Sequence, residues 1–208
     1  MSPSDRLNKY LFDRTASFLG LIILLPLILL LAIAVKLFMG KGPVLFRQKR
    51  VGKDGRLFTI LKFRTMVDGQ KGFTVTTEGE DRIYPFGAVL RKYHLDEMPE
   101  LWNVLKGDMS LVGPRPDVPG YADRLEGADR GILQLRPGIT GPATLKYRDE
   151  EHLLASQTNP LRYNDQVLYP DKVRINLYYL NHYSFKDDLR IITATITGRR
   201  IEYGGELI

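Results

Sequence analysis

The stretch TASFLGLIILLPLILLLAIAV, from Thr15 to Val35, decides the fold of this 208-residue chain. It carries no charged side chain. At ~1.5 Å per residue, a helix of this length matches the roughly 30 Å hydrocarbon core of a bilayer. Length alone favours a single membrane-spanning helix. Pro26, at the midpoint, removes the amide that would bond to the Ile22 carbonyl, and therefore predicts a kink.

Basic residues flank this segment on both sides. They are Arg6, Lys9 and Arg14 before it, and Lys36, Lys41, Arg47, Lys49 and Arg50 after it. Positive flanks prefer the cytoplasmic side, and a spanning helix can place only one of them there. Charge symmetry and Pro26 therefore favour a re-entrant helix that dips into the bilayer, bends and returns. A signal peptide is the weaker alternative, because no small-residue cleavage site follows before Lys36.

The remaining composition predicts one further domain. No second stretch reaches membrane length, which excludes a polytopic transporter. We expect a membrane segment with its flank at 1–40 and a cytosolic domain at 41–208. The absence of cysteine excludes disulfides, thiolate zinc sites and thiol nucleophiles. The net charge of +6 suits anionic lipid headgroups and phosphorylated substrates, whereas no motif supports nucleic-acid binding.

The first part of the cytosolic domain has the pattern of a β-hairpin. Residues 44–66 contain two β-rich runs separated by Gly52-Lys53-Asp54-Gly55, and Asp-Gly is a strong turn signal. Residues 68–82 contain glycine, threonine and charge without periodicity, which predicts a mobile loop.

The pattern then changes to helical spacing. Apolar residues recur at this spacing from Phe86 to Tyr93 and again from Met98 to Leu105, with Pro99 suited to the first turn of the second helix. Asp96 and Glu97 therefore fall at or just before a helix N-terminus. Gly107 is expected to end this helix, and a stiff turn holding Arg115 between two prolines follows at 113–116. Residues 136–142 form another stiff loop.

The last helical region begins after Pro170 and restarts at Ser184. Ser184 and Asp187 have the spacing of a capping box, and the helix that they open is expected to end in Gly198-Arg199-Arg200. Leu189, Ile192 and Ile196 share one face of the last helix, which we expect to pack on the core; a membrane-surface role is the alternative. Together these elements predict an α+β protein: a re-entrant membrane helix, a hairpin and a mainly helical domain with amphipathic helices at the membrane surface.

The chemistry is expected at Asp96 and Glu97. Common catalytic signatures are missing, and the three histidines, His94, His152 and His182, are isolated. The acid pair lies among the cations Lys62, Arg64, Arg91 and Arg115. At a helix start, free amides and the helix dipole favour anions, both carboxylates and phosphates. One carboxylate could attack phosphorus while its neighbour holds Mg²⁺.

Four motifs resemble the monotopic phosphoglycosyl transferases, the bacterial sugar transferase family, in order and over about residues 5–200. They are Phe46–Gly52 leading to Lys62–Met66, Leu90–Leu101 around Asp96-Glu97, Asn103–Pro116, and Arg136–Gly141. The resemblance implies transfer of a sugar phosphate from a UDP-sugar to undecaprenyl phosphate. Asp96 would attack the sugar-bearing phosphorus and expel UMP, and Glu97 would position Mg²⁺ or assist the incoming phosphate.

The resemblance also implies the site residues and the location. Asp96 and Glu97 would be catalytic and metal-binding, and Pro26 would form the membrane kink. The expected phosphate-binding residues are Lys62, Arg64, Arg91, Arg115 and Arg148. The enzyme would lie on the cytoplasmic face of the bacterial inner membrane, against anionic lipids, and a homodimer stays open.

The chain departs from the family pattern in a few places. Glu100 stands where glutamine is usual, and residues 142–147 differ near the expected base and sugar site. Without extra spanning helices, the chain resembles the small catalytic-core form. The competing hypothesis is a membrane-anchored adaptor without catalysis, which would need the cations but not the acids. A phosphatase that forms an aspartyl phosphate is disfavoured because the Asp-x-Asp pair is missing.

Overall fold

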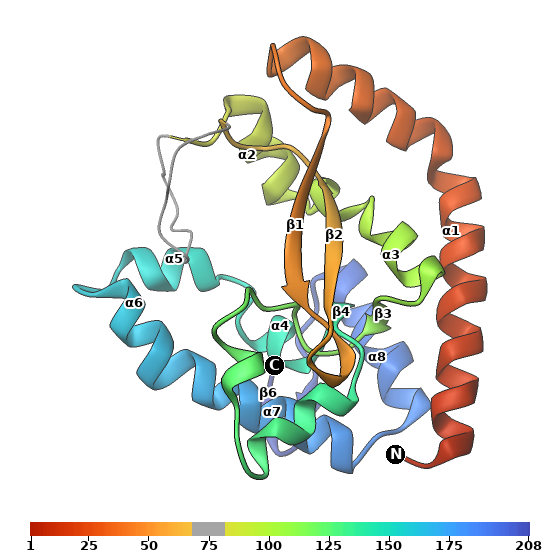
Figure 1. The fold of residues 1–208 in the computed structure, drawn as a ribbon, viewed down its shortest axis with the longest axis vertical. Helices are drawn as coiled ribbons and strands as arrows, with labels where there is room; N and C mark the ends of the chain where they lie inside the picture. Colours follow the sequence, from red (N-terminus) through yellow and green to blue (C-terminus); the bar gives the residue numbers. More distant parts are fainter. Residues whose placement is uncertain (68–81) are drawn as a thin grey trace.

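The apolar stretch lies within one long helix, α1 (Pro3–Phe38), in the computed structural model, which describes residues 1–67 and 82–208. The Ser2 hydroxyl caps α1 by accepting a hydrogen bond from the Asp5 amide at 3.1 Å. The helix is unbroken at Pro26. Among the described residues, α1 is the one helix long and apolar enough to cross a membrane. Figure 1 shows it along one side of the domain, with its C-terminal part leaning over the hairpin.

The predicted hairpin is confirmed. β1 (Leu45–Val51) pairs antiparallel with β2 (Leu57–Phe63), with Leu45 opposite Phe63 and Val51 opposite Leu57. The turn η1 (Lys53–Gly55) holds Asp54 at φ 58° and Gly55 at φ 76°. These are left-handed conformations that aspartate and glycine tolerate, which explains why Asp-Gly marks the turn. The loop predicted at 68–82 lies, except for Arg82, outside the described residues.

The two predicted helices after the hairpin are also confirmed. α2 (Pro85–Lys92) is followed by the 3₁₀ turn η2 (Leu95–Glu97) and by α3 (Glu100–Lys106). Between α2 and η2, His94 adopts a left-handed φ of 53° that redirects the chain. Gly107 ends α3 at φ 93°, as expected for a glycine at this position. Asp96 and Glu97 therefore lie just before the N-terminus of α3.

A small parallel sheet corrects the prediction of a stiff loop at 136–142, because one of its strands lies inside that segment and the other directly precedes the predicted turn at 113–116. β3 (Ser110–Val112) and β4 (Gly138–Thr140) pair with Ser110 opposite Gly138 and Val112 opposite Thr140. The backbones approach so closely that a Cβ on Gly138 would lie 2.2 Å from the Gly113 nitrogen. This contact fixes the turn that carries Arg115. Short parallel strands without alternation give no strand signal in the sequence.

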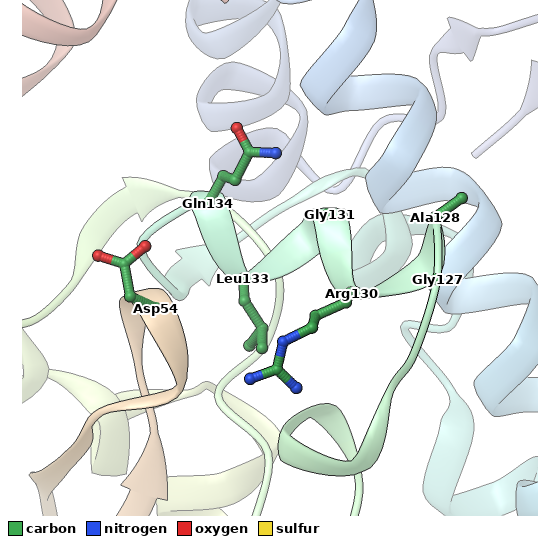
Figure 2. A pocket seen from close by; sticks show the side chains of 7 residues that line it. All are labelled: Asp54, Gly127, Ala128, Arg130, Gly131, Leu133 and Gln134. Atoms are coloured by element: carbon green, nitrogen blue, oxygen red, sulfur yellow. The ribbon is translucent and has the colours of Figure 1, made fainter.

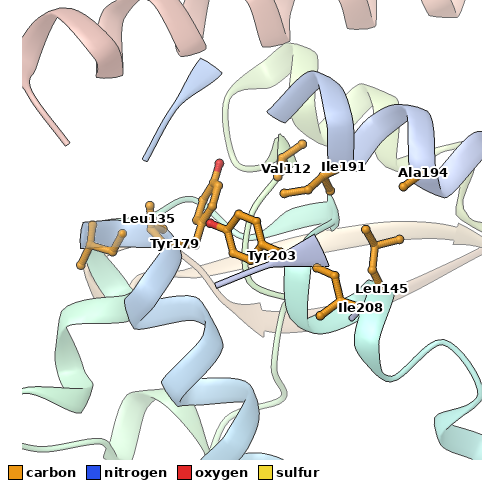
Figure 3. Close-up of a cluster of buried hydrophobic side chains, with 9 residues drawn as sticks. Val112, Leu135, Leu145, Tyr179, Ile191, Ala194, Tyr203 and Ile208 are labelled. Carbon is orange, nitrogen blue, oxygen red and sulfur yellow. The ribbon is translucent and has the colours of Figure 1, made fainter. Parts of the chain in front are cut away.

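The C-terminal half consists of short elements around a buried core. They are η3 (Ala122–Arg124), η4 (Asp129–Gln134), α4 (Pro142–Lys146), α5 (Glu150–Ala155), α6 (Pro160–Tyr163), η5 (Asn164–Leu168), α7 (Tyr169–Asn181), α8 (Phe185–Thr197), β5 (Glu202–Tyr203) and β6 (Glu206–Leu207). Figure 3 shows Tyr179 of α7 and Ile191 of α8 meeting Val112, Tyr203 and Ile208. The protein is of the α+β class, and 58% of its described residues are helical.

The predicted packing face of α8 is wrong at Leu189 and Ile196, whereas Ile192 does pack against the core. The buried residues of α8 are Asp188, Ile191 and Ala194, whereas Leu189 is 43% exposed and Ile196 is 79% exposed. The reason is Asp188, which is polar but is buried because it accepts a hydrogen bond from Lys9 at 2.7 Å. The start and end of α8 are as predicted: the Ser184 hydroxyl accepts from the Asp187 amide, and Gly198 ends the helix at φ 70°.

Both ends of α1 are attached to the same folded body. Near its N-terminus, Lys9 pairs with Asp188, and the buried Asp13 accepts hydrogen bonds from the Ser110 hydroxyl at 2.7 Å and the Leu111 amide at 3.2 Å. The C-terminal end contributes Leu31, Val35 and Met39 to a cluster with Phe63 and Leu90. From Phe18 to Ile33, the helix also exposes large apolar side chains: Phe18, Ile22, Ile23, Leu25, Leu29, Leu30 and Ile33.

Candidate active site

Asp96 and Glu97 lie on the turn η2, between α2 and α3, and both side chains are buried. The turn faces the end of strand β2, which carries Lys62. Glu97 Oε1 accepts hydrogen bonds from Lys62 Nζ at 2.6 Å and from Arg115 Nη2 at 2.9 Å. The hairpin, η2 and the turn after β3 therefore meet at one carboxylate.

Glu100, at the start of α3, is a further member of this cluster. Its carboxylate lies 3.1 Å from Lys62 Nζ, and the residue is almost fully buried. Burial, opposed by Lys62 and reinforced by the charge of Glu97, raises the pKa of Glu100 to about 7. The sequence offered one sign of this role, because Glu100 stands where the resemblance leads us to expect glutamine.

The two acids of the pair have opposite pKa shifts. Burial acts to raise the pKa of Glu97, but Arg115 and Lys62 outweigh it and hold this pKa well below its usual range. Burial also raises the pKa of Asp96, and the charge of Glu97 adds to this effect. Glu97 is therefore a permanent anion that fixes two cations, whereas Asp96 is the acid with the more weakly stabilised charge.

The Asp96 carboxylate has no hydrogen bond or ion pair with any residue in the described part of the chain. Three cations, Lys62, Arg91 and Arg115, nevertheless act on it electrostatically and favour its ionised form. Each of the three is bonded to a glutamate instead: Lys62 and Arg115 to Glu97, and Arg91 to Glu151 of α5. The result is a buried carboxylate without a partner among the described residues, on which three cations act, and this suits a nucleophile that meets an anionic substrate.

Two predicted phosphate-binding residues lie elsewhere. Arg64 is buried and donates to the carbonyls of Met39 at 3.0 Å and Lys41 at 2.8 Å, just beyond the end of α1. Arg148 donates to the carbonyl of Gly198 at 2.7 Å, beyond the end of α8. The structure therefore brings Lys62, Arg91 and Arg115 to Asp96 and gives Arg64 and Arg148 backbone partners. Their roles toward phosphate stay predictions.

Sequence reasoning missed a second layer of charge beside Arg115. Arg50 of β1 donates to the Pro116 carbonyl at 3.1 Å, and burial followed by the charge of Arg115 lowers its pKa. Asp117 accepts from the Tyr169 hydroxyl at 3.2 Å, and burial raises its pKa to about 6. Arg50 was counted only as a flanking charge, and nothing near Asp117 in the sequence marks it.

The donor set fits a Mg²⁺ ion that is shared with a phosphorylated substrate. Asp96 offers an unpaired carboxylate, and Glu97 has its contacts with Lys62 and Arg115 through one oxygen, Oε1. Within residues 1–67 and 82–208, no group of three or more acidic or histidine side chains could hold a metal. Mg²⁺ is commonly held by one or two carboxylates together with substrate phosphates, so two acids are sufficient.

Two pockets in the described structure lie away from these acids. The larger, of about 510 Å³, lies between the hairpin turn at Asp54 and the segment that carries Arg130 and Gln134 (Figure 2). The second, of about 270 Å³, lies beside the N-terminus of α1 and is lined by Arg6, Lys9 and Asp13 among others. Neither cavity is lined by Asp96 or Glu97, so the acid pair is identified by its charges and contacts rather than by a cavity.

A long apolar helix attached to a domain with a buried carboxylate pair and nearby cations is compatible with a membrane-anchored protein that binds phosphate. The family model described as bacterial sugar transferase matches residues 4–199. The chain belongs to this family of transferases, which confirms the resemblance found in the sequence.

Individual relatives agree with this assignment. The undecaprenyl-phosphate glucose phosphotransferase of Komagataeibacter xylinus is 37% identical, over 94% of this chain and 36% of its own length. The uncharacterized sugar transferase EpsL of Bacillus subtilis is 35% identical, over 90% of this chain and 85% of its own. The UDP-glucose:undecaprenyl-phosphate glucose-1-phosphate transferase of Caulobacter vibrioides is 38% identical, over 91% of this chain and 68% of its own. The chain thus spans about a third of the first of these relatives and most of the other two.

Proposed function

We propose that the protein transfers a sugar phosphate from a UDP-sugar to undecaprenyl phosphate through a covalent intermediate on Asp96. The observation that carries the proposal is the buried Asp96 carboxylate, which has no partner in the described chain although three cations act on it electrostatically. Membership of the bacterial sugar transferase family, and relatives named as transferases onto undecaprenyl phosphate, support the same chemistry.

The reaction has two balanced displacements at phosphorus. An Asp96 carboxylate oxygen attacks the sugar-bearing phosphorus, the bond from that phosphorus to the bridging oxygen breaks, and the electron pair leaves with UMP. A phosphate oxygen of undecaprenyl phosphate then attacks the same phosphorus, and the Asp96 carboxylate leaves. Lys62, Arg91 and Arg115 stabilise the charge on the phosphoryl oxygens in both displacements.

Besides the attack by Asp96, the acid pair orients the cations and would hold Mg²⁺. Glu97 holds Lys62 and Arg115 in place through its two short hydrogen bonds, so these cations are oriented before substrate arrives. A Mg²⁺ ion held by Asp96 and Glu97 would supply charge neutralisation at the diphosphate.

The membrane arrangement that we propose is re-entrant, with a bend at Pro26 and both ends of α1 on the cytoplasmic face of the inner membrane. The support is that Lys9 and Asp13 at one end, and Leu31 and Val35 at the other, contact the same domain. A helix crossing the bilayer would have to give up one set of contacts. Exposed apolar side chains on α8, such as Leu189 and Ile196, extend the surface available to anionic lipids.

The mechanism is tested by intact-protein mass spectrometry with a panel of UDP-sugars and no lipid. We expect a mass increase of one phosphosugar that maps to Asp96, with release of UMP. Asp96→Asn keeps the shape but removes the attacking charge, so the adduct and the activity should both disappear. Asp108→Asn, which removes an acid paired with Lys106 just after α3, is the matched control and should behave as the unmodified protein. Full activity in Asp96→Asn would refute the mechanism.

The topology is tested with single cysteines, since the chain has none of its own. Suitable positions are Ser4 and Lys41, which are both exposed. Gly42 is unsuitable because a Cβ there would lie 1.8 Å from Arg64 Nη1. A membrane-impermeant reagent should label both sites only after the cells are permeabilised, so that the reagent reaches the cytoplasmic face of the membrane. Labelling of one site alone in intact cells would restore the spanning helix.

A further inference from the structure

Each cation that acts on Asp96 is held by a glutamate, but the three arrangements differ in burial. Lys62 is held by Glu97 and Glu100, and Arg115 by Glu97; the side chains of these two glutamates are 9% and 3% exposed. Arg91 is held by Glu151, whose side chain is 46% exposed, while that of Arg91 is 22% exposed. The side chain of Arg115 is itself 47% exposed, so the pair between Arg91 and Glu151 is distinguished by its acid, which solvent reaches, whereas Glu97 and Glu100 are buried.

Burial decides which of these pairs a substrate can replace. Breaking a buried ion pair leaves an uncompensated charge away from water and is strongly unfavourable. An ion pair with a half-exposed acid contributes little, because water solvates the released carboxylate. A phosphate that approaches Asp96 can therefore displace Glu151 from Arg91 at a small cost in free energy. Lys62 and Arg115 remain paired with their glutamates and can donate to the phosphate only through their remaining N–H groups.

We propose that Glu151 is an internal competitor for the substrate phosphate: it occupies the Arg91 guanidinium in the free enzyme and is displaced when the diphosphate binds. Glu151 is then an affinity-determining residue that sets the substrate concentration at which the site fills. The identity of the diphosphate rests on the proposed function, whereas the competition itself requires only an anion with phosphate chemistry.

The position of α5 does not depend on this pair. Lys172 of α7 holds the neighbouring Glu150 at 2.6 Å, and Leu154 of α5 is buried in the domain. Replacing Glu151 by glutamine should therefore leave α5 in place. This separates the role of Glu151 in binding from any role in folding.

The test is isothermal titration of inorganic pyrophosphate into the full-length protein in detergent. Losing an ion pair of this exposure should make Glu151→Gln bind pyrophosphate up to about fivefold more tightly. Glu206→Gln is the matched control, because it removes an acid of similar exposure that is paired with Lys146 and Arg174. In an Arg91→Ala background the gain from Glu151→Gln should disappear.

Several results would overturn the inference. They are equal affinities in the unmodified protein and Glu151→Gln, a gain as large in Glu206→Gln, persistence of the gain without Arg91, and no pyrophosphate binding at all. UMP release from UDP-sugars, measured on the same samples, tests the proposed function separately. Tighter pyrophosphate binding by Glu151→Gln without UMP release would support the competition and refute the transferase activity. UMP release without tighter pyrophosphate binding would support the transferase activity and refute the competition.

Discussion

Replacing Glu100 by glutamine should change how the stability of the protein depends on pH. The pKa of Glu100 is raised from 4.5 to about 7, so the folded state binds a proton that the unfolded state has released. This contribution to stability is complete below pH 4.5 and is lost as pH rises through about 7. The shift corresponds to on the order of 3 kcal/mol. Glutamine resembles the protonated acid in shape and can still accept from Lys62, but it does not titrate.

The measurement is thermal unfolding in detergent at pH 5 and pH 8. For a chain of this size, on the order of 3 kcal/mol corresponds to about 6–12 °C in Tm. Between pH 5 and pH 8, we expect the Tm of the unmodified protein to decrease more than the Tm of Glu100→Gln by this amount. The pKa of Asp117 is also raised, to about 6, so Asp117 likewise loses its contribution to stability as pH rises. This contribution is the same in both proteins and cancels in the comparison. Exposed Glu126→Gln is the control. Parallel pH profiles for Glu100→Gln and the unmodified protein would refute the reasoning.

Two further substitutions test other parts of the structure. Arg115→Ala should reduce turnover by about 10²–10³, since it removes a preorganised donor at the phosphate, and near-normal turnover would move the reacting centre elsewhere. Lys62→Ala should have a similar effect, but it also leaves the buried Glu100 without its paired cation and Glu97 with Arg115 alone, so its unfolding curve must be recorded beside its rate. Lys9→Met leaves the buried Asp188 without its cation and should destabilise the fold by about 3–5 kcal/mol; an unchanged Tm would contradict the assigned pair.

The elements predicted well are those whose signals are local. The Asp54-Gly55 turn, the start of α8 at Ser184 and its end at Gly198 each depend on the conformational preference of one or two residues. The same holds for Gly107 after α3. Because these preferences act within a few residues, a single sequence shows them directly, and they place Asp96 and Glu97 just before a helix.

The elements missed depend on contacts between distant segments. The parallel pairing of Ser110 with Gly138 needs two strands that are short and lack alternation. The packing face of α8 was predicted from apolar residues, but burial of Asp188 depends on Lys9, which lies 179 residues away. In the same way, Arg91 was assigned to phosphate without Glu151, because sequence spacing cannot reveal a charge on another helix.

Arg64 links the end of α1 to the strand that carries Lys62. Arg64 directly follows β2 and lies two residues after Lys62. Its guanidinium donates hydrogen bonds to the carbonyls of Met39 and Lys41, which follow α1. A shift of the end of α1, such as one imposed by a thicker or thinner bilayer, would therefore be transmitted along the backbone to Lys62 and Glu97. We expect turnover to vary with lipid chain length, and to vary less in Arg64→Gln; equal dependence in both proteins would show that this linkage is not mechanical. The hairpin would then make the position of Lys62 depend on bilayer thickness, in addition to holding Lys62 beside Glu97.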